Sequence, residues 1–156
     1  MRITLGNDHC GFALKDHVRD VLEAIRVDVV DVGTHDTEPV DFPDITRQVC
    51  EPVRKGETDR GLLLCGTGVG ASIAANKIPG IRAALCHDTF SGHQCVEHDD
   101  VNVLCMGAWI IGAKSAEEVL RAFLGATFST SEEFQRRVAM LHEMEVTAAR
   151  ESSPAH

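Results

Sequence analysis

A cysteine followed by a glycine-rich loop is the feature of this 156-residue chain that most directly suggests chemistry. Cys65 ends an apolar run, and the loop GTGVG at residues 66–70 leads into a helical pattern. Free amides at a helix N-terminus can hold negative charge, and the positive end of the helix dipole lowers the pKa of a thiol placed there. We therefore expect the thiolate form of Cys65 to be favoured.

Three roles for Cys65 are open: a buried cysteine at the end of a strand, a nucleophile or redox thiol, and a general base. A redox thiol usually has a resolving partner, and none is near it in the sequence. A nucleophile usually needs a base and an oxyanion hole. A base needs a substrate proton made acidic, which the loop amides could provide by holding the developing anion. Proton abstraction beside a carbonyl, through an enediolate, has this requirement.

The glycine loop matches neither of the two familiar phosphate-binding motifs. The dinucleotide fingerprint belongs after the first strand, with an acidic residue about 20 positions further on, whereas this loop follows the third expected strand. A Walker A loop ends in Gly-Lys-Ser/Thr, but here Asn76 precedes Lys77. Taken alone, the loop would also fit a tight turn without a ligand. A nucleotide-binding module is therefore the weakest interpretation.

Other acid–base side chains follow the expected strands. The pair Asp8-His9 comes after the first strand, and His98 precedes two aspartates in a later helix. These residues, together with His87 and Asp88, could also be metal ligands, but their spacing matches no standard metal signature. For any one histidine a structural or solvated role is the commoner outcome. We rank a metal site behind acid–base chemistry.

Apolar runs that alternate with helical patterns predict the architecture. Strands are expected at 2–6, 27–32, 60–65, 81–86 and 102–107. Helices are expected at 11–26, 45–56, just after the glycine loop, 89–99 and 115–128. Pro52 should kink or end its helix. Five alternations predict a parallel sheet with helices on both faces, and such sheets bind ligands at the carboxyl ends of their strands.

The last expected helix, at about 131–150, has no strand to return to. It carries Arg136 and Arg137, which would suit a phosphate, although a solvated helix face is the plainer explanation of Arg136. Appended helices of this kind often pack on a second subunit. We expect residues 1–150 to form one domain and residues 151–156 a flexible tail.

Composition restricts the partners and the location. A formal net charge of −9 argues against nucleic acid or an anionic membrane surface, but leaves an anionic small molecule possible. No run of about 20 apolar residues is present, and the N-terminus has no signal-peptide pattern, so we expect a cytoplasmic protein. The six cysteines fit neither a zinc site nor a disulfide scaffold, and most should be small buried hydrophobes.

Three stretches resemble the ribose-5-phosphate isomerase B family, which includes galactose-6-phosphate isomerase subunits. They are NDHCGF at 7–12 with Lys15, CGTGVGASIAANKIPGIRAA at 65–84, and EHDDVNVLCMGA at 97–108. The resemblance runs from residue 2 to about 145. It implies a Rossmann-like three-layer α/β/α sandwich with a five-stranded parallel sheet. It also implies a homodimer or a tetramer, with active sites at the subunit interface and the C-terminal helix reaching across.

The resemblance further implies an aldose–ketose isomerase without metal or organic cofactor, with ribose 5-phosphate as the default substrate. Cys65 would shuttle the proton between C1 and C2 through a cis-enediolate, with Thr67 beside it. The amides of Gly66, Gly68 and Gly70 would hold the enediolate.

The family's remaining roles also fall on matching positions. Asp8 and His98 would open the furanose ring across the site. His9 would bind phosphate, together with Arg137 from the partner subunit. Asn102 would help to shape the site.

The chain departs from the family pattern mainly where substrate is bound. Trp109 and Glu133 replace usual arginines, Phe134 replaces a histidine, and Asp99 replaces a frequent asparagine. Arg136 could compensate for the lost arginines. Three alternatives stay open: an isomerase of another aldose phosphate, a sugar-phosphate-binding paralogue without turnover, and a subunit active only in a hetero-oligomer.

Overall fold

The computed structural model describes residues 1–151, and the part of the expected tail at 152–156 lies outside the described residues. The strands are β1 (Arg2–Asn7), β2 (Asp28–Asp31), β3 (Arg60–Cys65), β4 (Ala83–Leu85) and β5 (Val103–Gly107). The helices are α1 (Phe12–Ala24), α2 (Phe42–Arg54), α3 (Val69–Ala75), α4 (Thr89–Asp99), α5 (Ala113–Gly125) and α6 (Glu132–Glu151). The predicted alternation of strands and helices is confirmed.

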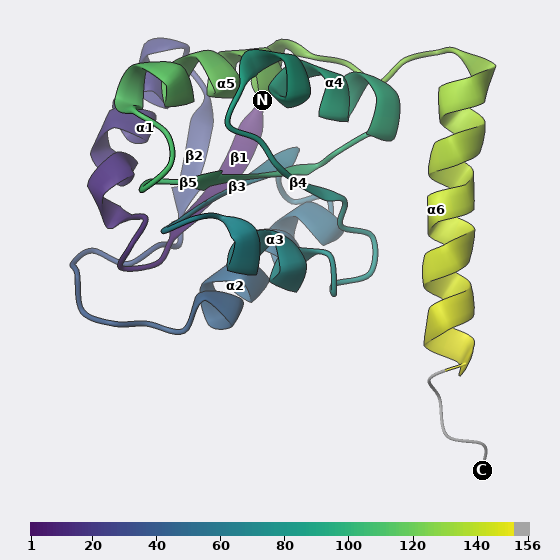
Figure 1. Cartoon of the computed structure of the whole chain (residues 1–156), viewed down its shortest axis with the longest axis horizontal. Helices are drawn as coiled ribbons and strands as arrows, with labels where there is room; N and C mark the ends of the chain where they lie inside the picture. The colour runs from purple at the N-terminus through teal and green to yellow at the C-terminus, as the bar shows by residue number, and fades with distance from the viewer. Residues whose placement is uncertain (152–156) are drawn as a thin grey trace.

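The five strands form one parallel sheet in the order β2-β1-β3-β5-β4. Helices α1, α4 and α5 cover one face and α2 and α3 the other, which makes three layers (Figure 1). In β3, Leu62 and Leu64 pack into the core on the first face, while Leu63 packs into the core on the second. Burial on both faces explains why this strand reads as a continuous apolar run. The Rossmann-like fold expected from the sequence is confirmed.

Some element boundaries differ from those expected. β4 is shorter than predicted because its entry is held by a side chain: the Arg82 amide donates to Asn102 Oδ1 at 2.9 Å. α5 ends at Gly125 because Arg60 turns its guanidinium onto the last carbonyls, donating to Phe123 O and, at 2.7 Å, to Ala126 O. Pro52 lies inside α2, which continues past it to Arg54, so Pro52 does not itself end the helix.

The last helix, α6, stands beside the three layers rather than within them (Figure 1). None of its residues is buried. It packs mainly on α4 and on the segment before β4, where Glu145 accepts hydrogen bonds from the Gly80 amide at 3.0 and 3.1 Å. Among residues 1–151, no helix combines the length and the apolar character needed to cross a membrane.

Candidate active site

Cys65 and Asp8 form a pair at the carboxyl edge of the sheet. The β1–β3 register pairs Asn7 with Leu64, and the Asp8 amide donates to Leu64 O at 3.1 Å. The residues that follow this pair, Asp8 and Cys65, therefore lie side by side. Asp8 is buried, and its Oδ1 accepts from the Gly11 amide at 2.8 Å. The half-buried Cys65 thiol donates a hydrogen bond to the Asp8 carboxylate.

The pKa of Cys65 lies above its ordinary value of 9.0, so the expectation of a favoured thiolate was wrong. Burial is the main cause, followed by the hydrogen bond to Asp8 and the charge of that carboxylate. The amides of Gly68 and Gly66 do contact the sulfur and lower its pKa, but by less. The resting pair is therefore a neutral thiol beside a carboxylate that can accept its proton.

The glycine loop is locked against the end of β5. Gly68 has φ +78°, in the left-handed region that glycine adopts without strain, and lets the chain turn into α3. The carbonyls of Cys65 and Gly66 accept from the amides of Ala108 at 2.8 Å and Trp109 at 2.9 Å. A Cβ on Gly107 would lie only 2.5 Å from the Thr67 carbonyl carbon. The loop backbone therefore has little freedom around the thiol.

Two aromatic rings flank the loop. The indole of Trp109 lies over Gly66, where an added Cβ would sit 2.8 Å from the ring, yet Trp109 remains 69% exposed. The ring of Phe42 lies over Gly70 in the same way, at 3.0 Å from an added Cβ. These rings limit the space around the loop amides.

His87 lies at the same edge of the sheet, although the sequence pattern indicated it only as a candidate metal ligand. The Gly107 amide donates to His87 Nε2 at 2.8 Å, so the neutral ring carries its proton on Nδ1. Burial lowers the pKa of His87, with a smaller opposing effect of Asp88, which keeps the ring in this acceptor form. Its position directly after the strand expected at 81–86 was the available signal.

His9 lies beside Asp8, and its Nδ1 accepts from the Val40 amide at 3.2 Å. A neutral His9 therefore carries its proton on Nε2 and can donate from that atom.

The other predicted residues lie at the opposite edge of the sheet. α4 starts after β4 at the carboxyl edge and returns to the amino edge, where it ends at Asp99 before β5 begins. β5 spans five residues, or about 16 Å at the usual rise. The structure therefore does not bring His98 and Asp8 together within one chain.

At the amino edge the start of α6 packs on the end of α4. The rings of His98 and Phe134 stack at 3.9 Å, and the Arg137 guanidinium lies 5.6 Å from the centre of the Phe134 ring. Arg137 also pairs with Glu133 at 3.6 Å, and Arg136 is exposed on the same helix. Phe134 and Glu133, which are departures from the family pattern, therefore contact predicted site residues directly.

The side-chain amide of Asn102 hydrogen-bonds to the backbone of its own chain. Besides accepting from the Arg82 amide, it donates to Gly80 O at 2.9 Å.

Exposed Asp99 lines a cavity of about 410 Å³ between α4, α6 and the start of β4. Within residues 1–151, no three His, Cys, Asp or Glu side chains are arranged to hold a metal ion.

The fold and the site define a class: a Rossmann-like α/β protein with a thiol, a carboxylate and a locked amide loop at one edge of its sheet. The family model "Ribose/Galactose Isomerase" matches residues 3–141. The chain therefore belongs to the ribose/galactose isomerase family, as the sequence resemblance predicted, and is an aldose–ketose isomerase.

Individual relatives cover most of the chain. Ribose-5-phosphate isomerase B of Escherichia coli is 42% identical over 86% of this chain and 91% of its own length. D-erythrulose-4-phosphate isomerase 2 of Mycolicibacterium smegmatis is 39% identical over 82% and 86%. The solved structure of Clostridium thermocellum ribose-5-phosphate isomerase B superposes with a TM-score of 0.92 at 41% identity, covering 95% of this chain and 99% of that one.

Proposed function

We propose that this chain interconverts a phosphorylated aldose and its 2-ketose, by default ribose 5-phosphate and ribulose 5-phosphate, with Cys65 as the base. The observation that carries the proposal is the Cys65–Asp8 pair set within the loop amides. Relatives named for ribose 5-phosphate, one of them a solved structure that superposes along nearly the whole chain, support the substrate.

The proton steps follow from the geometry of the pair. Asp8 accepts the thiol proton as substrate binds, and the Cys65 thiolate then removes the proton from C2 of the open-chain aldose. The electron pair moves to the carbonyl oxygen, and the cis-enediolate is held by the amides of the glycine loop, with Thr67 beside the thiol. The hydroxyl proton on the C2 oxygen moves to the C1 oxygen, so that the C2 carbonyl forms as Cys65 returns its proton to C1. The product is the ketose, and no redox partner is needed.

The second half of the site is proposed to come from another copy of the chain. His98 and Arg137 lie too far from Cys65 within one chain, whereas a two-fold dimer can place the amino edge of one copy against the carboxyl edge of the other. α6 has no buried residue, and large apolar side chains are exposed around the glycine loop, at Val69, Ile73 and Ile110. A homodimer, or a tetramer made of such dimers, fits these features. There His98 would join Asp8 in opening the sugar ring, and His9 and Arg137 would hold the phosphate.

A four-carbon aldose phosphate is the second candidate substrate. Trp109 occupies the space over Gly66 beside the base, which favours a shorter sugar. A relative of similar identity is named for erythrulose 4-phosphate.

The test is NMR of the purified protein in deuterated water with ribose 5-phosphate and erythrose 4-phosphate, run beside Cys65→Ala. We expect ketose formation and deuterium at C2 in the wild type, reduced about 100-fold or more in the variant, because a positioned base contributes that much. Sugar-phosphate binding should persist in Cys65→Ala.

Normal turnover by Cys65→Ala would show that another group is the base. Binding without turnover in the wild type would instead support the paralogue or hetero-oligomer alternative.

A further inference from the structure

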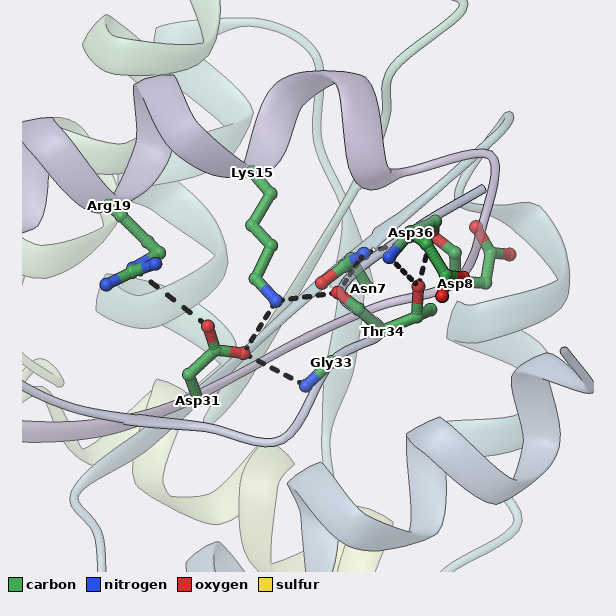
Figure 2. Close-up of polar contacts among 8 residues, drawn as sticks. All are labelled: Asn7, Asp8, Lys15, Arg19, Asp31, Gly33, Thr34 and Asp36. Carbon is green, nitrogen blue, oxygen red and sulfur yellow. Dashed lines mark hydrogen bonds and ion pairs between the residues drawn. The ribbon is translucent and has the colours of Figure 1, made fainter. Parts of the chain in front are cut away.

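Lys15 is a buried ammonium that the proton-transfer scheme does not use. It lies on α1 with its side chain only 2% exposed. Its Nζ lies 3.0 Å from Asp31 Oδ1 at the end of β2 and donates to Thr34 O at 2.7 Å (Figure 2). An ammonium is costly to bury unless it is paired, so these two contacts determine where the group can lie.

The two contacts tie the loop at residues 33–41 to the sheet. Asp31 Oδ1 also accepts from the Gly33 amide at 3.0 Å (Figure 2). The Thr34 amide donates to Asn7 O at 3.1 Å. Asn7 Nδ2 in turn donates to the carbonyl of Asp8 at 3.1 Å. The start of the loop is thus held on β1, the strand that ends directly before Asp8.

The loop keeps its shape through its own side chains and ends on the site. Thr34 Oγ1 donates to Asp36 O at 2.6 Å, and Asp36 Oδ1 accepts from the Glu38 amide at 3.0 Å. Two residues further on, the Val40 amide donates to His9 Nδ1. The His9 ring is therefore oriented by the end of a loop whose start is fixed by Lys15.

We propose that Lys15 is a positioning residue: it clamps the loop at 33–41 so that the Val40 amide holds His9 as the Nε2–H tautomer, a fixed donor to the anionic group of the substrate. The donor role rests on the proposed function. The tautomer does not, and it can be observed without substrate.

The test compares a variant that removes the clamp with one that removes a neighbouring charge. Lys15→Met is combined with Asp31→Asn, so that no unpaired carboxylate is left beside the apolar side chain. The control is Arg19→Met, because Arg19 approaches the same carboxylate at 3.9 Å but is 55% exposed. Long-range ¹⁵N NMR of the histidine rings reports the tautomer, with the His9 signals assigned through His9→Gln.

We expect wild type and Arg19→Met to show an unprotonated Nδ1 and a protonated Nε2 at His9. The double variant should show a mixture of tautomers, and its KM for the sugar phosphate should rise about tenfold, as for one lost hydrogen bond to a charged group, with kcat within about threefold. A double variant that keeps both the tautomer and KM would overturn the proposal, because Lys15 would then serve stability alone.

Val40→Pro tests the same contact without changing the buried pair, and it decides the matter if the double variant does not fold. Proline has no amide donor, so the His9 tautomer should again become mixed. An unchanged tautomer in Val40→Pro would also overturn the proposal. Absence of turnover in wild type with the NMR result intact would refute the proposed function alone.

Discussion

At the scale of single residues, the chemistry of the site rests on how Asp8 and Cys65 affect each other. A carboxylate that accepts the thiol hydrogen bond stabilises the protonated sulfur and raises its pKa. The loop amides act in the other direction. In the mechanism that we propose, the base is therefore stored as a thiol and becomes a thiolate when its proton moves to Asp8.

Asp8→Asn should lower the pKa of Cys65. The variant removes the negative charge, so the thiolate forms at lower pH, and the thiolate is the form that reacts with iodoacetamide. In wild type the alkylation rate at Cys65 should rise with pH through a midpoint above 9.0, and in Asp8→Asn through a lower one. Peptide mass spectrometry distinguishes Cys65 from the other cysteines. Asp16→Asn, an exposed change on α1, should keep the wild-type midpoint, and equal midpoints in all three proteins would contradict the inferred effect of Asp8.

Trp109 should influence which sugar is accepted. Trp109→Ala opens the space over Gly66, so the ratio of kcat/KM for ribose 5-phosphate to that for erythrose 4-phosphate should rise about tenfold, as expected for a pocket enlarged by a few carbons. Trp109→Phe keeps a ring at this position and should stay closer to wild type. A ratio that is the same in all three proteins would place the indole outside the substrate's reach.

At the scale of elements, the site depends on a close fit between the glycine loop and the end of β5. Gly107 allows the loop backbone to approach β5 closely, and its amide is held by His87 Nε2. The same strand end thus contacts the loop on one side and the residue after β4 on the other.

Gly107→Ala should disturb this fit. The added methyl would overlap the backbone of Thr67, so we expect a loss of about 1–3 kcal/mol in the free energy of unfolding, and lost activity in the fraction that still folds. Urea unfolding and turnover measure the two effects. Gly125→Ala, at an exposed helix end with no atom near the new methyl, should be neutral or slightly stabilising. Equal stability of the two variants would show that the loop can move away from β5.

The elements also show how far sequence reasoning reached. β3 and α4 have the predicted bounds, because an apolar run of strand length and a helix with Asp88 as its N-cap are strong local signals. Cys65 and Asp8 could be paired because parallel strands end at a common edge. The sign of the Cys65 pKa shift was missed, since it depends on burial and on a contact across strands that no local pattern reveals.

The position of His98 could have been inferred from topology. A helix between two parallel strands must return to the amino edge, so the end of α4 cannot lie beside the residues that follow β1. The contact of Phe134 with His98 had no such signal, because it depends on where α6 docks.

At the scale of the whole molecule, one chain presents two half-sites. The thiol and carboxylate lie at the carboxyl edge, while His98 and Arg137 lie at the amino edge near α6. The proposed dimer would give a role to α6, a helix without buried residues that is attached to an otherwise complete sandwich.

Two inactive variants should therefore regain activity when they are mixed. In a mixed dimer of Cys65→Ala and His98→Gln, one of the two sites has all its wild-type groups, so random pairing should recover about a quarter of wild-type activity. Two affinity tags confirm that mixed dimers have formed. Cys65→Ala mixed with Asp8→Asn, which lie at the same edge, should recover nothing. Equal activity of the two mixtures would mean that each site is built within one chain.

If the active site is shared between two copies, as we propose, catalysis depends on the protein concentration. Because neither edge of a lone chain carries both sets of groups, turnover per chain should fall when the protein is diluted below the dissociation constant of the dimer. A substrate analogue that contacts both copies should resist this fall, because it binds the assembled pair and not the separated chains. For this enzyme, the protein concentration would then determine how many active sites are assembled.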